Sequence, residues 1–115
     1  MKRYKIVRRD LEDGTRHAPF AHHYRYAPEY FPRRRHIGPW LERTGPPQKC
    51  WSGYHFIKAR NLRLWLWALV LCSGAYEVWE VHVREATYWD CKGAARRIRF
   101  VRRLTAKEIK ALVEK

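Results

Sequence analysis

The distribution of proline is the feature that most constrains how this chain can fold. All six prolines lie between Thr15 and Gln48, and none lies elsewhere in the chain. Because proline fixes φ and donates no backbone hydrogen bond, it is rare inside helices and central strands. The sequence therefore predicts an irregular basic arm over 15–48 and a regular core over 49–115. At 115 residues, both are expected to form a single domain, 1–115.

Segments rich in β-branched and aromatic residues predict four strands, because such side chains suit a half-buried pleated sheet. The last of these segments alternates arginine with apolar residues, which predicts one basic face and one apolar face. The predicted strands are Tyr4–Val7, Tyr54–Ile57, Tyr76–Val83 and Ala95–Leu104, with turns at Asp10–Gly14 and Lys92-Gly93 and a short helical turn near Pro28–Phe31.

Two helices are also predicted. Leu62–Cys72 is apolar on nearly all sides, and Asn61 and Gly74 suit its ends as N-cap and C′ residue. Near the C-terminus, Thr105 and Glu108 form a capping-box sequence that predicts a short terminal helix. The expected fold is therefore α+β: a small, mostly antiparallel sheet with one buried helix and a capped C-terminal helix.

The net charge of +14 points to a polyanionic or acidic partner. Basic residues outnumber acidic ones on both sides of Gln48, so the charge is not confined to a tail. So basic a chain repels itself unless an anion screens it, and its many arginines suit bidentate contacts with phosphate. A solvated basic surface without a specific partner is the alternative. The longest apolar run, Leu64–Cys72, is far shorter than the roughly 20 residues of a membrane-spanning helix, so no membrane partner is expected.

Arginine and aromatic residues are interleaved in the arm, and a second arginine cluster follows in the last predicted strand. Arginines would bind phosphates, while exposed rings would stack on the bases of a single strand. In the alternative interpretation the rings belong to the core and the arginines only solvate it. Arg97, Arg99 and Arg103 are expected on one face of the last strand. The predicted nucleic-acid-binding residues are Arg33, Arg34, Arg35, Lys92, Arg96, Arg97, Arg99, Arg102 and Arg103, and the predicted aromatic anchors are Tyr24, Tyr26, Tyr30 and Trp40.

Cysteine and histidine do not predict a metal site. Cys50, Cys72 and Cys91 are widely spaced, without a Cys-x-x-Cys pair. The charged N-terminal residues do not resemble a secretory signal, so the cysteines fit a reduced compartment, and a cytoplasmic location is expected. Cys50 with His55 or His82 would be a conceivable nucleophile and base, but no orienting acid or oxyanion loop accompanies them. No metal, no cofactor and no catalytic residue is predicted, and the pattern favours a non-catalytic protein.

The order of motifs resembles that of a group of small proteins of phages and prophages. The resemblance rests on the Cys-x-x-Gly-aromatic-His turn from Cys50 to His55, and on the segments Tyr76–Val81 and Ala94–Arg99. It covers about Cys50–Leu112 together with the first strand. It implies no particular activity, but it does imply that the protein would act in the cytoplasm of a bacterial host.

A more distant resemblance is to ADP-ribosyltransferases, in which a Gly-aromatic-aromatic strand precedes a helix and a strand of alternating acidic and apolar residues. Gly53–Phe56 and Tyr76–Val83 are similar in outline. The resemblance would make Glu77, Glu80 or Glu85 the acidic residue. Tyr4–Arg8 lacks the residue that would bind nicotinamide ribose.

Three hypotheses on function follow. The leading one is a small, basic, phage-type accessory protein that binds a polyanionic target without catalysis. The target would be nucleic acid, or a host nucleic-acid machine such as RNA polymerase or a defence complex that the protein would inhibit. The alternatives are an ADP-ribosyltransferase-like enzyme or a degenerate relative, and a structural or assembly protein of a virion.

Overall fold

The computed structural model describes residues 2–10, 12–18, 21–33, 36–42, 54–62, 75–88 and 92–114. Strands predominate in these residues, and every strand pairing is antiparallel. The strands are β1 Arg3–Arg9, β2 Arg16–Ala18, β3 Ala21–Tyr26, β4 Leu41–Glu42, β5 Tyr54–Lys58, β6 Ala75–Tyr88 and β7 Gly93–Arg103; the helical segments are η1 Pro28–Tyr30, η2 Ala59–Asn61 and the α-helix α2 Ala106–Val113.

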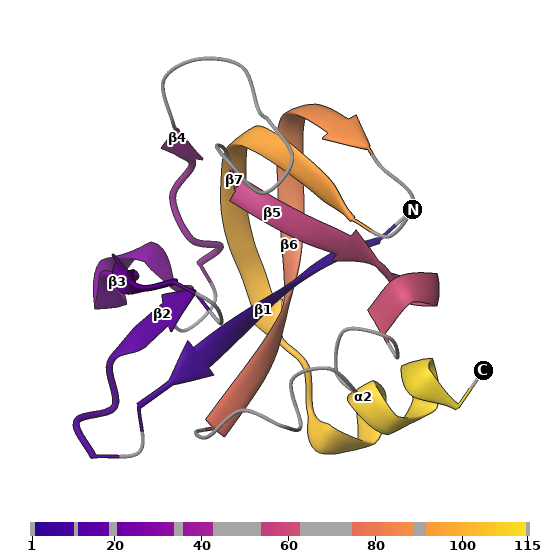
Figure 1. The fold of residues 1–115 in the computed structure, drawn as a ribbon, viewed down its shortest axis with the longest axis horizontal. Coiled ribbons are helices and arrows are strands. Elements are labelled where there is room, and N and C mark those ends of the chain that lie inside the picture. The colour runs from indigo at the N-terminus through magenta and orange to yellow at the C-terminus, as the bar shows by residue number, and fades with distance from the viewer. Residues whose placement is uncertain are drawn as a thin grey trace.

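Four of the strands form a closed ring of pairings around a core (Figure 1). The long strand β6 pairs with β1 along one edge and with β7 along the other. The short strand β5 pairs with the first residues of both β1 and β7, which closes the ring. Beyond β5, β1 continues to pair with β2, and β7 continues to pair with β4. The ring therefore has an inner and an outer side.

Each side of the ring buries its own group of apolar residues. Successive residues of a strand point to opposite faces, so that Val7 and Trp79 join one cluster while Ile6 and Val78 join the other. The helix α2 covers the second cluster, beside η2. The inner core is Val7, Tyr26, Phe31, Leu41, Phe56, Trp79, Val81, Ala95, Ile98 and Phe100. The outer core is Tyr4, Ile6, Ile57, Leu62, Val78 and Leu104.

The four predicted strands and the C-terminal helix are confirmed. The third strand is longer than predicted, since β6 extends to Tyr88. The polar turn at Asp10–Gly14 is also confirmed: the Gly14 amide donates to the Asp10 carbonyl at 3.0 Å, and Gly14 has a φ of 74°, which glycine adopts without strain. The predicted helical turn near Pro28–Phe31 corresponds to η1. The coarse fold, a mostly antiparallel sheet with a C-terminal helix, is thus as expected.

Two expectations need correction. The arm 15–48 is not irregular throughout, because its described residues include β2, β3, η1 and β4. Gly93 is not part of a turn but begins β7, paired with Phe56. The predicted buried helix, Leu62–Cys72, lies outside the described residues apart from Leu62. The prediction of a single domain stays a prediction.

In the described part of the chain, no helix has the length and apolar character needed to cross a bilayer.

The capping box of α2 supports a testable prediction. The Thr105 hydroxyl accepts from the Glu108 amide at 3.2 Å, and the Glu108 carboxylate accepts from the Thr105 amide at 3.1 Å. We expect Thr105→Ala to lower the free energy of unfolding by about 1 kcal/mol, because an amide of the first turn loses its acceptor. Urea denaturation measures the change. Thr105→Ser keeps the acceptor and should stay close to wild type; equal losses in both variants would contradict the role of the cap.

Candidate nucleic-acid interface

A β-bulge divides the arginines of β7 between its two faces. The pairing of β7 with β6 shifts by one residue after Phe100, and a bulge of this kind reverses the alternation of side chains beyond it. As a result Arg102, rather than Arg103, lies on the face of Arg97 and Arg99. The prediction that Arg103 shares that face is wrong.

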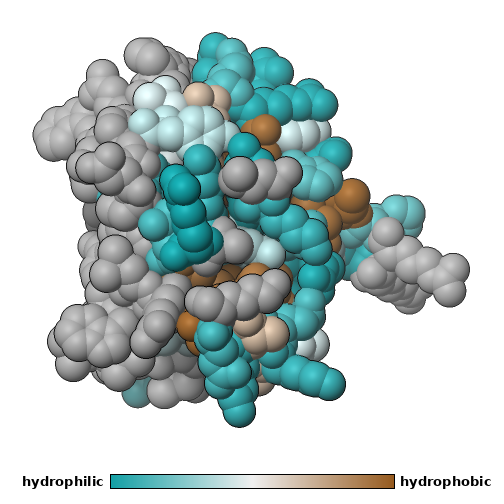
Figure 2. Space-filling view, turned by 90° about the vertical axis from the view of Figure 1, so that its right-hand side faces the viewer, coloured by the Kyte–Doolittle hydropathy of each residue, from teal (hydrophilic) through white to brown (hydrophobic). Residues whose placement is uncertain are grey.

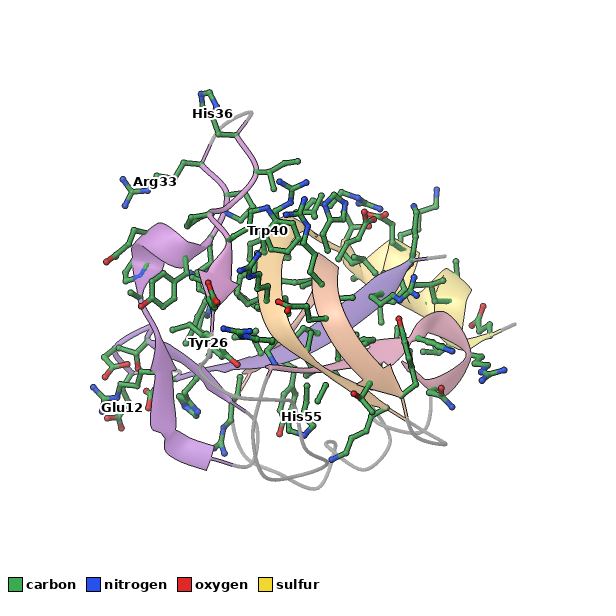
Figure 3. All side chains as sticks on the ribbon, turned by 90° about the horizontal axis from the view of Figure 1, so that it is seen from above. Glu12, Tyr26, Arg33, His36, Trp40 and His55 are labelled. Carbon is green, nitrogen blue, oxygen red and sulfur yellow. The ribbon has the colours of Figure 1, made fainter. Side chains whose placement is uncertain are left out.

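Trp40, labelled in Figure 3, lies against two arginines on the outer side of β6 and β7. The centroid of its ring is 4.3 Å from the guanidinium carbon of Arg84 and 4.7 Å from that of Arg99. Both distances fall within the range of cation–π contacts. Arg99 Nε also donates to Nδ1 of His82 at 3.0 Å. We call the surface formed by Trp40, His82, Arg84, Arg97 and Arg99 the Trp40 face.

Like charges oppose one another on the Trp40 face. Arg84 of β6 is directly opposite Arg97 of β7, an arrangement that destabilises a sheet unless nearby groups offset it. Glu42 and Glu85 partly offset it, since each lies within 4.0 Å of Arg97 and of the neighbouring Arg96. Arg96 and Arg97 thus share two carboxylates. Arg84 and Arg99 add two further positive charges, so the surface keeps an excess of positive charge.

The backbone around Gly38 positions Trp40. The Gly38 amide donates to the carbonyl of Phe100 at 2.9 Å, and a Cβ at Gly38 would stand 2.5 Å from the carbonyl oxygen of Tyr30. Only glycine allows so close an approach of the two backbones. Three residues further, Leu41 pairs with Ile98 and enters the inner core. Trp40, its neighbour, is therefore left on the outer side.

The loop before Gly38 carries part of the predicted arginine run. The His36 amide donates to the Arg33 carbonyl at 3.0 Å, and both side chains are exposed. In Figure 3 Arg33 and His36 project away from the body of the protein, on the loop that leads to Trp40. Arg34 and Arg35 lie outside the described residues.

A shallow groove of about 410 Å³ borders the Trp40 face along β6. His82 and Arg84 contribute to both surfaces, and Arg3 and Tyr88 also line the groove. Tyr88 is 42% exposed, its hydroxyl lies 2.8 Å from a nitrogen of Arg3, and the Lys58 ammonium is 4.6 Å from its ring centroid. A second aromatic ring is thus flanked by two cations.

The predicted aromatic anchors have different locations. Tyr26 is only 5% exposed and packs in the inner core, so its prediction as an exposed anchor is wrong. Tyr30 packs against the same core while partly exposed. The side chain of Tyr24 lies outside the described residues. The fold places Trp40 among arginines.

The predicted arginines of β7 do not form one continuous basic patch. Arg96 and Arg97 pair with Glu42 and Glu85. Arg102 pairs with Glu80 and Glu108, and Arg103 pairs with Glu77. Lys92 is half-buried just before β7. Figure 2 shows hydrophilic side chains over most of the described surface on one side of the molecule, with apolar residues in small separate patches.

Sequence reasoning missed His82 and Arg84. Both follow from the alternation along β6, in which Val81 and Val83 face inward and the residues next to them face outward. This alternation is visible in the sequence, but the strand was expected to end at Val83, before Arg84. Their meeting with Trp40 depends on β4 pairing with β7, which no local pattern predicts.

A second arginine cluster surrounds Glu77, whose side chain is 1% exposed. Glu77 Oε1 accepts from Arg16 Nε at 2.7 Å and from Trp79 Nε1 at 3.1 Å. Arg103 lies 3.2 Å and Arg9 3.8 Å from Oε2. Burial alone would raise the pKa of Glu77, but the hydrogen bonds from Arg16 and Trp79 and the charges of Arg16 and Arg103 lower the pKa below its usual value of 4.5. We call Glu77, Arg9, Arg16 and Arg103 the Glu77 cluster.

The three acids that the ADP-ribosyltransferase resemblance would make functional each contact a cation. Glu77 is held in its cluster, Glu80 lies within 4.0 Å of Lys2 and Arg102, and Glu85 lies beside Arg96 and Arg97.

Comparison with protein-family models, with characterised proteins and with solved structures finds no significant match to this chain.

Proposed function

We propose that the protein binds single-stranded nucleic acid through the Trp40 face, without catalysis. The observation that carries this proposal is the contact of the Trp40 ring with the guanidinium groups of Arg84 and Arg99. Proteins that bind single strands combine cationic grooves for the backbone with aromatic rings for the bases. The Trp40 face has both elements side by side.

Charge supports the same function. Arg84 and Arg97 oppose each other across β6 and β7, and their repulsion is relieved when a phosphate lies between them. The groove along β6 would extend the path of the strand from the Trp40 face to Tyr88, where Arg3 and Lys58 supply further cations. The exposed loop with Arg33 leads to Trp40 and would add non-specific phosphate contacts.

The salt dependence of binding provides the test. Arg84→Ala/Arg99→Ala is expected to weaken binding of a labelled mixed-sequence single strand, DNA or RNA, about tenfold or more at low salt. It should also reduce the slope of log Kd against log salt by up to about two, because up to two phosphate contacts are lost. Fluorescence anisotropy over a salt series measures both quantities.

The matched control is Lys107→Ala/Lys110→Ala, which removes the same charge from the exposed surface of α2. This control should bind almost as well as wild type. Equal losses of affinity in the two double variants would show that binding depends only on net charge. A flat salt dependence in wild type would overturn the proposal. Binding of duplex as tightly as of single strand would remove the role of base stacking.

Three alternatives of a different class remain proposals. An acidic surface on a host nucleic-acid machine would be recognised by the same arginines, and a pull-down that survives nuclease treatment would favour it. Presence of the protein in purified virus particles would favour a virion component. Transfer of label from NAD to a host protein would favour ADP-ribosylation.

A further inference from the structure

The Glu77 cluster holds more positive charge than its carboxylate can balance. Three guanidinium groups lie within 4.0 Å of the single carboxylate of Glu77. Counting these four groups, one negative charge against three positive charges leaves an excess of two. A buried acid needs partners to be stable, but one well-placed arginine already meets much of that need. The other two arginines call for a different explanation.

Arg16 is the arginine that is fixed in place. It contacts both carboxylate oxygens, through Nε at 2.7 Å and through NH2 at 3.4 Å. Its guanidinium carbon also lies 4.6 Å from the ring centroid of Phe31 and 5.9 Å from that of Trp79. Because its guanidinium contacts both carboxylate oxygens of Glu77 and also the rings of Phe31 and Trp79, Arg16 is held in one orientation. It forms the rigid floor of the cluster together with Glu77.

Arg9 and Arg103 are held more loosely. Each approaches Glu77 Oε2 with a single nitrogen, NH1, at 3.8 Å and 3.2 Å respectively. Their side chains are 42% and 50% exposed. Because a guanidinium carries five N–H groups, one ion pair leaves most of these donors available for a further acceptor. Both arginines can therefore bind an anion from solvent without leaving the carboxylate.

The sheet brings these charges together at a cost. Arg9 of β1 is directly opposite Arg16 of β2, and like charges in that relation destabilise a sheet. Glu77 supplies one negative charge to the group. A second anion above the cluster would balance the rest.

We propose that Arg9, Arg16 and Arg103 form a binding site for a doubly charged phosphate group. The excess of two positive charges matches a phosphate dianion, and its oxygens suit the planar donor forks of Arg9 and Arg103. The Glu77 carboxylate positions Arg9 and Arg103, and Arg16 balances the negative charge of Glu77. The site lies on the opposite face of β7 from the Trp40 face and does not depend on it.

The test is a titration of the full chain with sodium phosphate, at constant ionic strength against sodium chloride, followed by NMR of the arginine Nε–Hε signals. Saturable shifts of the Arg9 and Arg103 signals with phosphate, but not with chloride, are expected. Arg9→Ala/Arg103→Ala should weaken the apparent affinity at least tenfold, whereas Lys107→Ala/Lys110→Ala should leave it unchanged. Linear shifts, or an affinity that is the same in both double variants, would overturn the site.

A second variant and further probes complete the design. Arg9→Lys/Arg103→Lys keeps the charge and removes the forks, so an intermediate loss is expected even if the alanine variant fails to fold. A nucleoside monophosphate and a 5′-phosphorylated oligonucleotide distinguish a free phosphate from the end of a strand, because only a ligand that reaches the site displaces inorganic phosphate. An oligonucleotide without a terminal phosphate reports on the Trp40 face alone, so failure of one site is distinguishable from failure of the other. If none of the phosphate compounds shifts Arg9 or Arg103, the proposal is wrong.

Discussion

Glu77→Gln is expected to lower the free energy of unfolding by about 3 kcal/mol near neutral pH. Removing one member of a buried ionic group costs about 3–5 kcal/mol, because the partner charges stay uncompensated. The lower end applies here, since Arg9 and Arg103 are about half exposed and water screens them. Glutamine keeps the shape of the side chain and an acceptor for Trp79, so the change isolates the charge. Urea denaturation of both proteins measures the difference.

The difference should depend on pH in one direction. The folded protein lowers the pKa of Glu77 below 4.5, so its carboxylate contributes stability that is fully present above the unfolded pKa and is lost as pH falls through the folded pKa. The two proteins should therefore converge in acid. Glu108, whose pKa a hydrogen bond from Arg102 lowers to about 2, titrates in both proteins and cancels from the comparison. A difference that stays constant from neutral pH into acid would refute the ionic role of Glu77.

Gly93→Ala is expected to destabilise the inner core by about 1–3 kcal/mol, the usual cost of forcing an extra group into a packed interior. A Cβ at position 93 would stand 2.4 Å from Cζ of Phe56. Phe56 is 2% exposed, and its ring packs edge-on against Tyr88 at a centroid distance of 5.6 Å. Gly93 pairs with Phe56 on one edge and with Tyr88 on the other, so the backbone cannot move aside easily. Urea midpoints with unchanged m-values are the measurement.

A double variant separates this clash from the general cost of changing a glycine. Phe56→Leu alone leaves a cavity and is destabilising. In Gly93→Ala/Phe56→Leu the new methyl group occupies part of that cavity. The loss in the free energy of unfolding of the double variant should therefore be smaller than the sum of the two single losses, by about 0.5–3 kcal/mol. Simple additivity would show that Phe56 does not determine the requirement for glycine.

Much of the local structure could be predicted from the sequence. The strands β1, β5, β6 and β7 and the cap of α2 depend on neighbouring residues: the composition of each segment, the alternation of Arg97 and Arg99 with apolar residues, and the spacing of Thr105 and Glu108. The strands β2 and β3 escaped prediction. Their residues are polar or aromatic in no clear alternation, and they become strands because β1 offers a pairing edge beyond β5.

The candidate sites depended on register and on contacts between distant segments. The bulge after Phe100 determines which of Arg102 and Arg103 lies on which face, and no local pattern distinguishes the two arginines. Glu77 is an ordinary acid in a strand sequence, yet it becomes the centre of a cluster because β1, β2 and β7 each bring it an arginine. Tyr26 was predicted to be an exposed anchor and is a core residue for the same reason.

The sequence by itself determined four of the strands, β1, β5, β6 and β7, where the terminal helix begins and how basic the surface must be. These properties follow from side-chain preferences and charge, which act along the chain. Only the tertiary structure decided that Trp40 would meet Arg84 and Arg99, and that three arginines would converge on Glu77. Each meeting joins residues far apart in sequence. It exists because strand register and a single bulge, selected by burial of the two cores, determine which faces the arginines share.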